Sequence, residues 1–164
     1  MVRILGLDPS LSSTGWGVIE QEGCRLKYIA DGFIKTDPKK PIEERLSLLY
    51  HTLCDVVETY KPTEASIEVI FLNDNPKSTI KLSEARGVVV LVPGVYHIPL
   101  CEYEPSKVKK ALVGTGSALK TQVETMVSVL LSGVKPKNND SSDALAIAIT
   151  HAHFRGSKAR IMGN

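Results

Sequence analysis

Residues 2–20 of the chain read VRILGLDPSLSSTGWGVIE, and this stretch decides the fold. Residues 2–7 are an apolar run rich in branched side chains that stops at Asp8-Pro9, which predicts a buried strand. Small polar residues follow as a turn, and residues 14–20 predict a second strand. Residues 25–35, after a turn at Gly23, predict a third strand. Three consecutive strands with short connections indicate an antiparallel meander.

The hydrophobic pattern changes after residue 40. Apolar residues recur at three- and four-residue steps over residues 41–60, which predicts an amphipathic helix that ends at Lys61-Pro62. Residues 64–71 predict a fourth strand, and the order strand-helix-strand favours its parallel addition to the sheet. Further along, we expect a helix over 77–92 that ends at Pro93-Gly94, a strand over 96–103, and helices over 105–112, 119–131 and 140–153.

These elements predict one α/β domain over residues 1–164, built on a mixed five-stranded sheet flanked by helices. Three of its strands are antiparallel and the others are parallel additions. Residues 156–164 are expected to form a frayed basic tail.

The composition excludes several classes of protein. No apolar run approaches the roughly 20 residues that span a bilayer, and the N-terminus is unlike a signal peptide, so we expect a cytoplasmic protein without a membrane partner. Cys24, Cys54 and Cys101 are far apart and odd in number, which disfavours zinc sites and disulfides.

Charge is unevenly distributed along the chain. Residues 1–104 carry 11 Lys or Arg against 15 Asp or Glu, whereas residues 105–164 carry 9 against 3. The C-terminal third is therefore basic, which favours an anionic partner such as a phosphate backbone, although an uneven solvated surface gives the same count.

Four carboxylates stand at the ends of predicted elements. Asp8 ends the first strand, Glu68 lies in the fourth, and Asp140 and Asp143 begin the last helix on one face of it. Clustered carboxylates repel one another unless they bind a hard cation, and an oxygen-only set suits Mg²⁺ or Mn²⁺ rather than zinc. Two such ions about 4 Å apart could activate a water and stabilise the leaving oxygen of a phosphodiester.

Each acid also has a structural interpretation. Asp8 before Pro9 can stabilise a turn, and Asp140 and Asp143 can serve as an N-cap and as a first-turn acid at the positive end of a helix. Glu68 in so apolar a strand is harder to explain without a partner. The four acids together favour a reaction site.

Five segments, in order over nearly the whole chain, resemble the motifs of RuvC-type Holliday-junction resolvases, which have the ribonuclease-H-like fold. These segments are the opening hairpin over 4–20, EVIF over 68–71, KLSEARG over 81–87, VGTGSALK over 113–120 and DSSDALAIA over 140–148. The opening motif by itself is weakly specific, but the ordered set is highly specific.

The resemblance implies a homodimer that cuts two opposed strands of a four-way DNA junction with Mg²⁺, during recombination and repair. It assigns Asp8, Glu68, Asp140 and Asp143 as metal ligands and as catalytic residues, with one or two ions left open. A branch-migration motor and an association with the bacterial nucleoid are implied in the same way.

The resemblance also assigns residues that contact DNA. Lys109 and Lys120 match lysines that act on the backbone near the cut, and Lys120 counts as catalytic. Phe71 matches an aromatic that stacks on bases of the opened junction, or it is a core residue. Arg86 contacts phosphate or forms an ion pair on or between helices. Ser10 departs from the family, which usually has glycine there, and a left-handed backbone would strain a serine.

Other functions fit parts of the sequence. An N-terminal Asp on a glycine-flanked strand pair is also found in actin-like sugar kinases and ATPases, but 164 residues are too few for their two domains. A junction-binding relative without catalysis, and a nuclease of the same fold acting on RNA or hybrid duplexes, remain alternatives. The second helix, with Ile80, Leu82, Val88 and Leu91, is a candidate dimer face, although core burial explains its apolar stripe equally well.

Overall fold

The computed structural model describes the backbone of residues 1–70 and 76–161, and the side chains of residues 1–70 and 76–155. Its strands form one sheet in the order β3-β2-β1-β4-β5. They are β1 Val2–Asp8, β2 Ser13–Glu22, β3 Arg25–Lys35, β4 Glu64–Glu68 and β5 Leu100–Tyr103. The first three are antiparallel, and β4 and β5 add in parallel beside β1. The predicted mixed sheet is confirmed.

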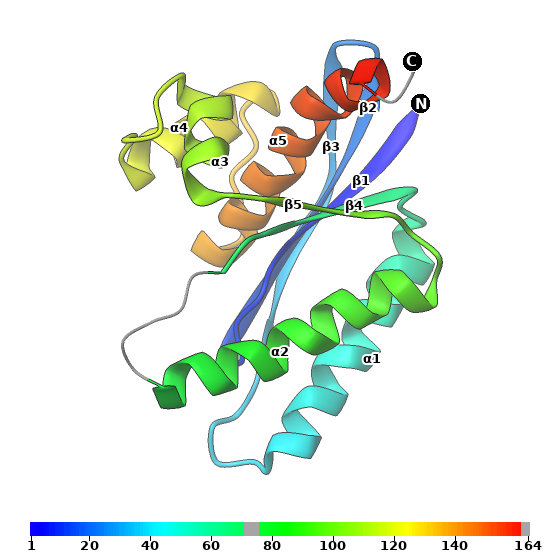
Figure 1. Cartoon of the computed structure of the whole chain (residues 1–164), viewed down its shortest axis with the longest axis vertical. Helices are drawn as coiled ribbons and strands as arrows, with labels where there is room; N and C mark the ends of the chain where they lie inside the picture. Colours follow the sequence, from blue (N-terminus) through cyan, green and yellow to red (C-terminus); the bar gives the residue numbers. More distant parts are fainter. Residues whose placement is uncertain (71–75, 162–164) are drawn as a thin grey trace.

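Helices cover both faces of this sheet (Figure 1). The helices α1 Ile42–Tyr60 and α2 Pro76–Val95 lie on one face, and α3 Pro105–Val113, α4 Lys120–Leu130 and α5 Asn139–Ile161 lie on the other. The alternation of strand side chains supplies both cores. Ile4 packs with the side of α3, α4 and α5, whereas Leu5 and Leu7 pack with the side of α1 and α2.

The close contact between α5 and the sheet depends on glycines. A Cβ added to Gly6 of β1 would lie 2.0 Å from the carbonyl oxygen of Ala144 and 2.9 Å from the Cβ of Ala148. A Cβ on Gly15 of β2 would lie 2.0 Å from the carbonyl oxygen of Asp140. The backbone of α5 therefore rests directly on β1 and β2, and this fixes where its N-terminal acids lie.

The end of α2 differs from the prediction. We expected Pro93-Gly94 to end the helix at residue 92, but it continues to Val95 with Pro93 inside it. Proline in the last turn removes only its own donor, and the turn is closed by Tyr96 N–H to the Val92 carbonyl at 3.2 Å and Ile98 N–H to the Pro93 carbonyl at 2.8 Å. Since residues 96–98 close the helix, β5 begins at Leu100 rather than at residue 96.

Other boundaries also moved. β4 ends at Glu68 rather than at residue 71, because β5, its partner, ends at Tyr103 opposite Glu68. The backbone of α5 continues to Ile161 through Gly156, beyond the predicted end at residue 153, since one glycine costs a helix only about 1 kcal/mol. Residues 156–161, which we expected in a frayed tail, are therefore helical. Ser10 does not have a positive φ, so its backbone is not strained in the way that a left-handed conformation would strain a serine.

None of the helices in the described part of the chain has the length and apolar character to cross a bilayer.

Substitution of Gly6 by alanine should test the contact between α5 and β1. The added methyl would collide with the backbone of α5, so we expect Gly6→Ala to lower the free energy of unfolding by about 3 kcal/mol or more in urea denaturation. Gly87→Ala in α2 is the control, because no heavy atom lies within 4 Å of its added Cβ. The control should stabilise the helix by about 0.5–1 kcal/mol, and equal effects of the two substitutions would contradict this packing.

Candidate active site

Two carboxylates meet where the central strands end. Asp8 is the last residue of β1 and Glu68 the last residue of β4, and these parallel neighbours pair Leu7 with Ile67, one residue earlier. Their side chains lie on the face toward α5, since Gly6 contacts α5 and the Ser66 hydroxyl lies 3.4 Å from the Ile147 carbonyl. Parallel pairing therefore brings together two acids that are 60 positions apart.

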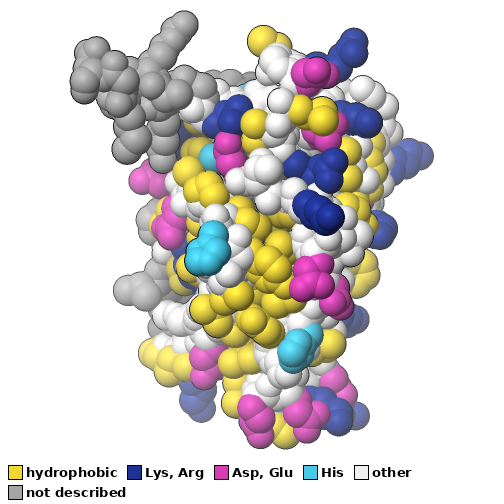
Figure 2. All heavy atoms as spheres, turned by 90° about the vertical axis from the view of Figure 1, so that its right-hand side faces the viewer, with side chains coloured by type: hydrophobic (Ala, Val, Ile, Leu, Met, Phe, Trp, Pro, Cys, Tyr) yellow, Lys and Arg dark blue, Asp and Glu magenta, His cyan; other side chains and the backbone are white. Residues whose placement is uncertain are grey.

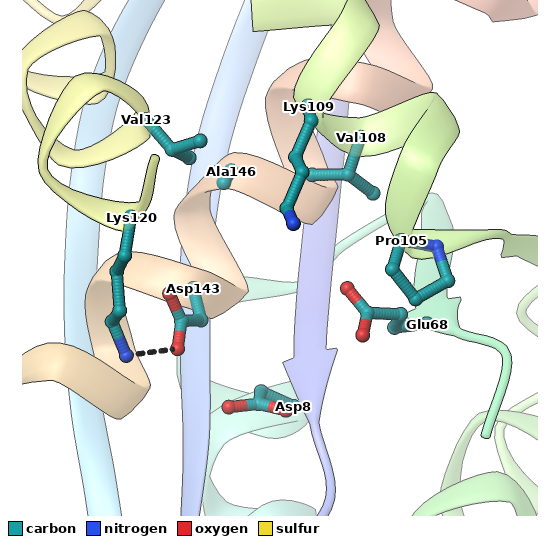
Figure 3. Close-up of a pocket in the computed structure, with 9 residues that line it drawn as sticks. All are labelled: Asp8, Glu68, Pro105, Val108, Lys109, Lys120, Val123, Asp143 and Ala146. Atoms are coloured by element: carbon teal, nitrogen blue, oxygen red, sulfur yellow. Dashed lines mark hydrogen bonds and ion pairs between the residues drawn. The ribbon is translucent and has the colours of Figure 1, made fainter. Parts of the chain in front are cut away.

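Helices complete the site from above the sheet. Figure 3 shows Asp143 of α5, Lys109 of α3 and Lys120 of α4 converging on Asp8 and Glu68. They surround a hollow of about 330 Å³. Its wall is completed by apolar side chains of α3, α4 and α5 and by the first residue of α3: Pro105, Val108, Val123 and Ala146.

Burial and mutual repulsion disfavour the charged forms of these acids. Burial, followed by Asp143, Glu68 and Asp140, raises the pKa of Asp8 to about 7, although Lys120 lowers it. Burial and then Asp143 raise the pKa of Glu68, and Lys109 lowers it. Without a cation, the site therefore holds negative charge at an energetic cost.

Lys120 neutralises part of that charge. Its ammonium donates a hydrogen bond to Oδ2 of Asp143 at 3.0 Å. Burial is the main cause that raises the pKa of Asp143, and this hydrogen bond opposes it. The predicted placement of Lys109 and Lys120 beside the acids is thus what the structure shows, while their action on DNA stays a prediction.

Asp140 lies apart from the other acids. Its Oδ2 accepts hydrogen bonds from the Ser13 hydroxyl at 2.5 Å and from the Asn138 amide at 3.0 Å, and it does not line the hollow. It is not the N-cap of α5 either, because Asn138 Oδ1 takes that role by accepting from the Ser141 N–H at 2.8 Å. An asparagine directly before an apolar helix is a typical N-cap, so the role of Asn138 could have been predicted from the sequence. No sequence pattern indicates that Ser13 contacts Asp140.

The donor set fits a hard divalent cation. It consists of carboxylate oxygens. The pKa of Asp8 is raised mainly by burial and further by repulsion from the other acids, and such a cation relieves this repulsion. As arranged, no three Asp, Glu, His or Cys side chains of the described residues form a closed metal site. Asp143 and Asp140 are turned toward Lys120 and Ser13, so they would have to exchange these hydrogen bonds to join Asp8 around an ion.

Arg86 supports the site from α2. Its Nη1 donates to the backbone carbonyl of Glu68 at 2.7 Å, and its Nη2 pairs with Glu102 of β5 at 2.9 Å. Arg86 therefore forms an ion pair, as expected. We expected its partner to lie on the same helix or on another helix, but the partner, Glu102, lies on a strand. A contact of Arg86 with phosphate stays a prediction, and Phe71 lies outside the described residues.

Comparisons with known proteins show the family of the chain. Residues 4–151 match the family model described as crossover junction endodeoxyribonuclease RuvC. The chain is 50% identical over 159 residues to the RuvC crossover junction endodeoxyribonuclease of Xanthobacter autotrophicus, covering 97% of this chain and 94% of that protein. It is also 50% identical over 161 residues to that of Gluconacetobacter diazotrophicus, covering 98% and 96%.

A solved structure shares the fold over nearly the whole length. Thermus thermophilus RuvC in complex with a Holliday-junction substrate superposes with a TM-score of 0.90 at 29% identity, covering 96% of this chain and 97% of that one. The ordered motifs, the sheet topology and the family match agree over most of the chain. The chain therefore belongs to the RuvC family of crossover junction endodeoxyribonucleases.

Proposed function

We propose that this protein is a metal-dependent endonuclease that resolves four-way DNA junctions by paired, symmetric cuts during recombination and repair. One observation carries the proposal: three carboxylates from β1, β4 and α5 line one hollow together with two lysines. Its relatives are named crossover junction endodeoxyribonucleases, and one solved relative holds a Holliday-junction substrate. We treat residues 1–164 as one nuclease domain.

We assign Asp8, Glu68 and Asp143 as ligands of Mg²⁺, with Mn²⁺ able to replace it, and Asp140 as a further ligand once it leaves Ser13. The bound metal would supply a water of lowered pKa and charge stabilisation at the phosphate. The protein holds the carboxylates in fixed positions, since Asp8 and Glu68 are the last residues of neighbouring strands. Binding of one or of two ions is compatible with these ligands.

Lys120 and Lys109 are assigned to the phosphate of the cut strand. In the free protein, Lys120 donates to Asp143, and Lys109 stabilises the charge of Glu68. When the carboxylates bind a cation, the ammonium of Lys120 is free to donate to a phosphate oxygen. In this proposal, each lysine balances the charge of a carboxylate in the free protein and of a phosphate in the complex.

We further propose a homodimer, because two cuts related by a two-fold axis need two sites. Ile80, Leu91 and Val95 share one face of α2 and are 58%, 53% and 48% exposed. Figure 2 shows a broad hydrophobic area on the side of the molecule where α1 and the end of α2 lie. Leu82 and Val88, which we had placed on the same stripe, are half-buried and belong to the side of α2 nearer the sheet.

Two further assignments rest on family resemblance. A branch-migration motor is the proposed partner of the dimer on the junction. The cytoplasm, with the bacterial nucleoid, is the proposed location, since the relatives found are bacterial.

Asp8→Asn should separate binding from cutting. The substitution removes a ligand charge and keeps the shape, so we expect junction binding to persist while the cutting rate falls at least about a thousandfold. The assay compares an end-labelled four-way junction with a linear duplex of matching sequence, in Mg²⁺ and in EDTA. Asp55→Asn on the exposed surface of α1 is the matched control and should cut normally.

Paired nicks on the junction alone, lost in EDTA and in Asp8→Asn, would support the proposal. Tight binding by the wild-type protein without any cut would favour the non-catalytic relative. Preferential cutting of RNA or of hybrid duplexes would favour the alternative of a nuclease of the same fold that acts on those substrates.

Stability should depend on pH through the same carboxylate. Because the pKa of Asp8 rises from 3.8 to about 7, the folded protein keeps a proton that the unfolded chain has lost between these values. In EDTA, the free energy of unfolding should therefore fall as the pH rises from about 4 to 7. Asp8→Asn should make the free energy of unfolding less dependent on pH. At pH 8, the free energy of unfolding of this variant should exceed that of the wild-type protein by on the order of 2–4 kcal/mol.

Urea denaturation in EDTA at pH 5, 6, 7 and 8 measures this dependence, with Asp55→Asn as the control that keeps the wild-type slope. Parallel slopes for the wild-type protein and Asp8→Asn would show that the burial of Asp8 and the repulsion from its acidic neighbours do not limit stability.

Leu91→Asp should weaken the proposed dimer. Placing a charge at the centre of an apolar interface should raise the dimer dissociation constant at least about a hundredfold, measured by sedimentation velocity. Val129→Asp in α4 is the control, because Val129 is 63% exposed and lies on the opposite side of the sheet. A wild-type monomer, or equal effects of the two substitutions, would argue against this face.

A further inference from the structure

Arg45 of α1 is a buried cation without a carboxylate partner. The residue is 8% exposed, its Nε donates to the Thr36 hydroxyl at 2.9 Å, and its Nη2 donates to the Leu11 carbonyl at 3.3 Å. No carboxylate among the described side chains forms a salt bridge with it. A buried charge normally has an opposite charge beside it, and a guanidinium offers five N–H donors, so Arg45 has the capacity to bind an anion.

The hollow beside Arg45 is lined by no acid among the residues that the structure describes. It has a volume of about 300 Å³ and is lined by Ser10, Leu11, Ser12, Pro38, Arg45, Ser78, Lys81 and Leu82. Two acids, Asp37 and Glu44, share a different hollow with Arg45, and both are engaged there. Glu44 pairs with Lys40 at 3.2 Å, and Asp37 accepts the Lys39 N–H at 2.9 Å. The side with the serines is therefore positively charged.

This set of groups is complementary to a phosphate. The residues that line the hollow include one arginine, one lysine and three serines, and hydrogen bonds from donors to an anion belong to the stronger class. Ser78 also lies in the first turn of α2, where backbone N–H groups and the helix dipole favour negative charge. A divalent cation would be repelled by Arg45 and Lys81, so the two hollows differ in the ligand they select.

The hollow is next to the acidic site. Ser10 follows Asp8 by two residues, and Leu82 lines both this hollow and the neighbouring one formed by Asp8, Pro9, Glu68, Val69, Ile70 and Pro105. A strand bound at Asp8 would therefore have a second hollow, lined by Arg45, next to the acidic site. Contacts to phosphates that are not cut fix the register of a nucleic acid on a protein.

We propose that Arg45 and Lys81, with the hydroxyls of Ser10, Ser12 and Ser78, bind one backbone phosphate of the cut strand, a few nucleotides from the cut. The proposal rests on the proposed function as a junction endonuclease. These are positioning residues: they hold the strand in register, and the carboxylates carry the chemistry. Ser10 adds a hydroxyl to this subsite.

Single uncharged phosphates in the junction test the proposal. Methylphosphonate groups are placed one at a time near the cut, and binding is measured in EDTA for the wild-type protein, Lys81→Ala and Lys27→Ala. Lys27 is an exposed lysine of β3 at the other end of the sheet, so its substitution changes net charge equally. We expect one position where the modification weakens wild-type binding about tenfold but leaves Lys81→Ala, already about tenfold weaker, nearly unchanged.

Salt dependence gives a second readout. The slope of log K against log salt concentration should be about 1 smaller for Lys81→Ala than for the wild-type protein. Ser78→Ala should weaken binding at the same position without changing the slope, because it removes a donor but no charge. Arg45→Lys, checked for folding by circular dichroism, should shift the methylphosphonate profile at that position alone.

The two proposals fail in different ways. If the wild-type protein cuts junctions but Lys81→Ala and Lys27→Ala show the same methylphosphonate profile and salt slope, the phosphate subsite is wrong and the endonuclease stands. If the wild-type protein does not cut junctions, the proposed function is wrong, and the same binding series on linear duplex still decides whether Lys81 and Arg45 hold a phosphate.

Discussion

The direct contact between α5 and the two central strands determines the rest of the site. Gly6 and Gly15 leave no side chain between strand and helix, so the backbone of α5 lies against β1 and β2. At the other end, Glu64 of β4 accepts hydrogen bonds from Arg155 at 2.6 Å and from His151 at 2.6 Å, which anchors the same helix. With both ends held, Asp143 can only lie above the strand ends that carry Asp8 and Glu68.

This rigidity has an electrostatic cost. The carboxylates cannot move apart when they are charged, because two are set by strands and one by an anchored helix. Burial contributes most to the raised pKa of Asp8, and its acidic neighbours add to it. A fold selected for stability alone would place apolar groups at these strand ends, whereas a site that binds a cation needs uncompensated negative charge before the cation arrives.

Much of this arrangement could be predicted from the sequence, because strand alternation and motif order are local signals. The sheet topology and the gathering of Asp8, Glu68 and Asp143 followed from them. The orientation of Asp140 did not, since it depends on the Ser13 hydroxyl, which lies far away in the sequence. Pro93 misled the prediction for a similar reason: its effect depends on how the following residues close the last turn.

Arg45 shows a further limit of local patterns. The spacing of Arg45 from Leu49 puts it on the apolar face of α1, and only the fold shows that the guanidinium there donates to Thr36 and Leu11. The cations around the two hollows differ in whether a carboxylate lies beside them. Lys120 lies beside a carboxylate and offsets its charge, whereas Arg45 and Lys81 have no carboxylate partner among the described side chains. Cations that offset acids stabilise the free protein, whereas cations without acids keep their charge available for a phosphate. In the proposed function, Arg45 and Lys81 would therefore hold DNA beside the cut without weakening the attraction of the acidic site for metal.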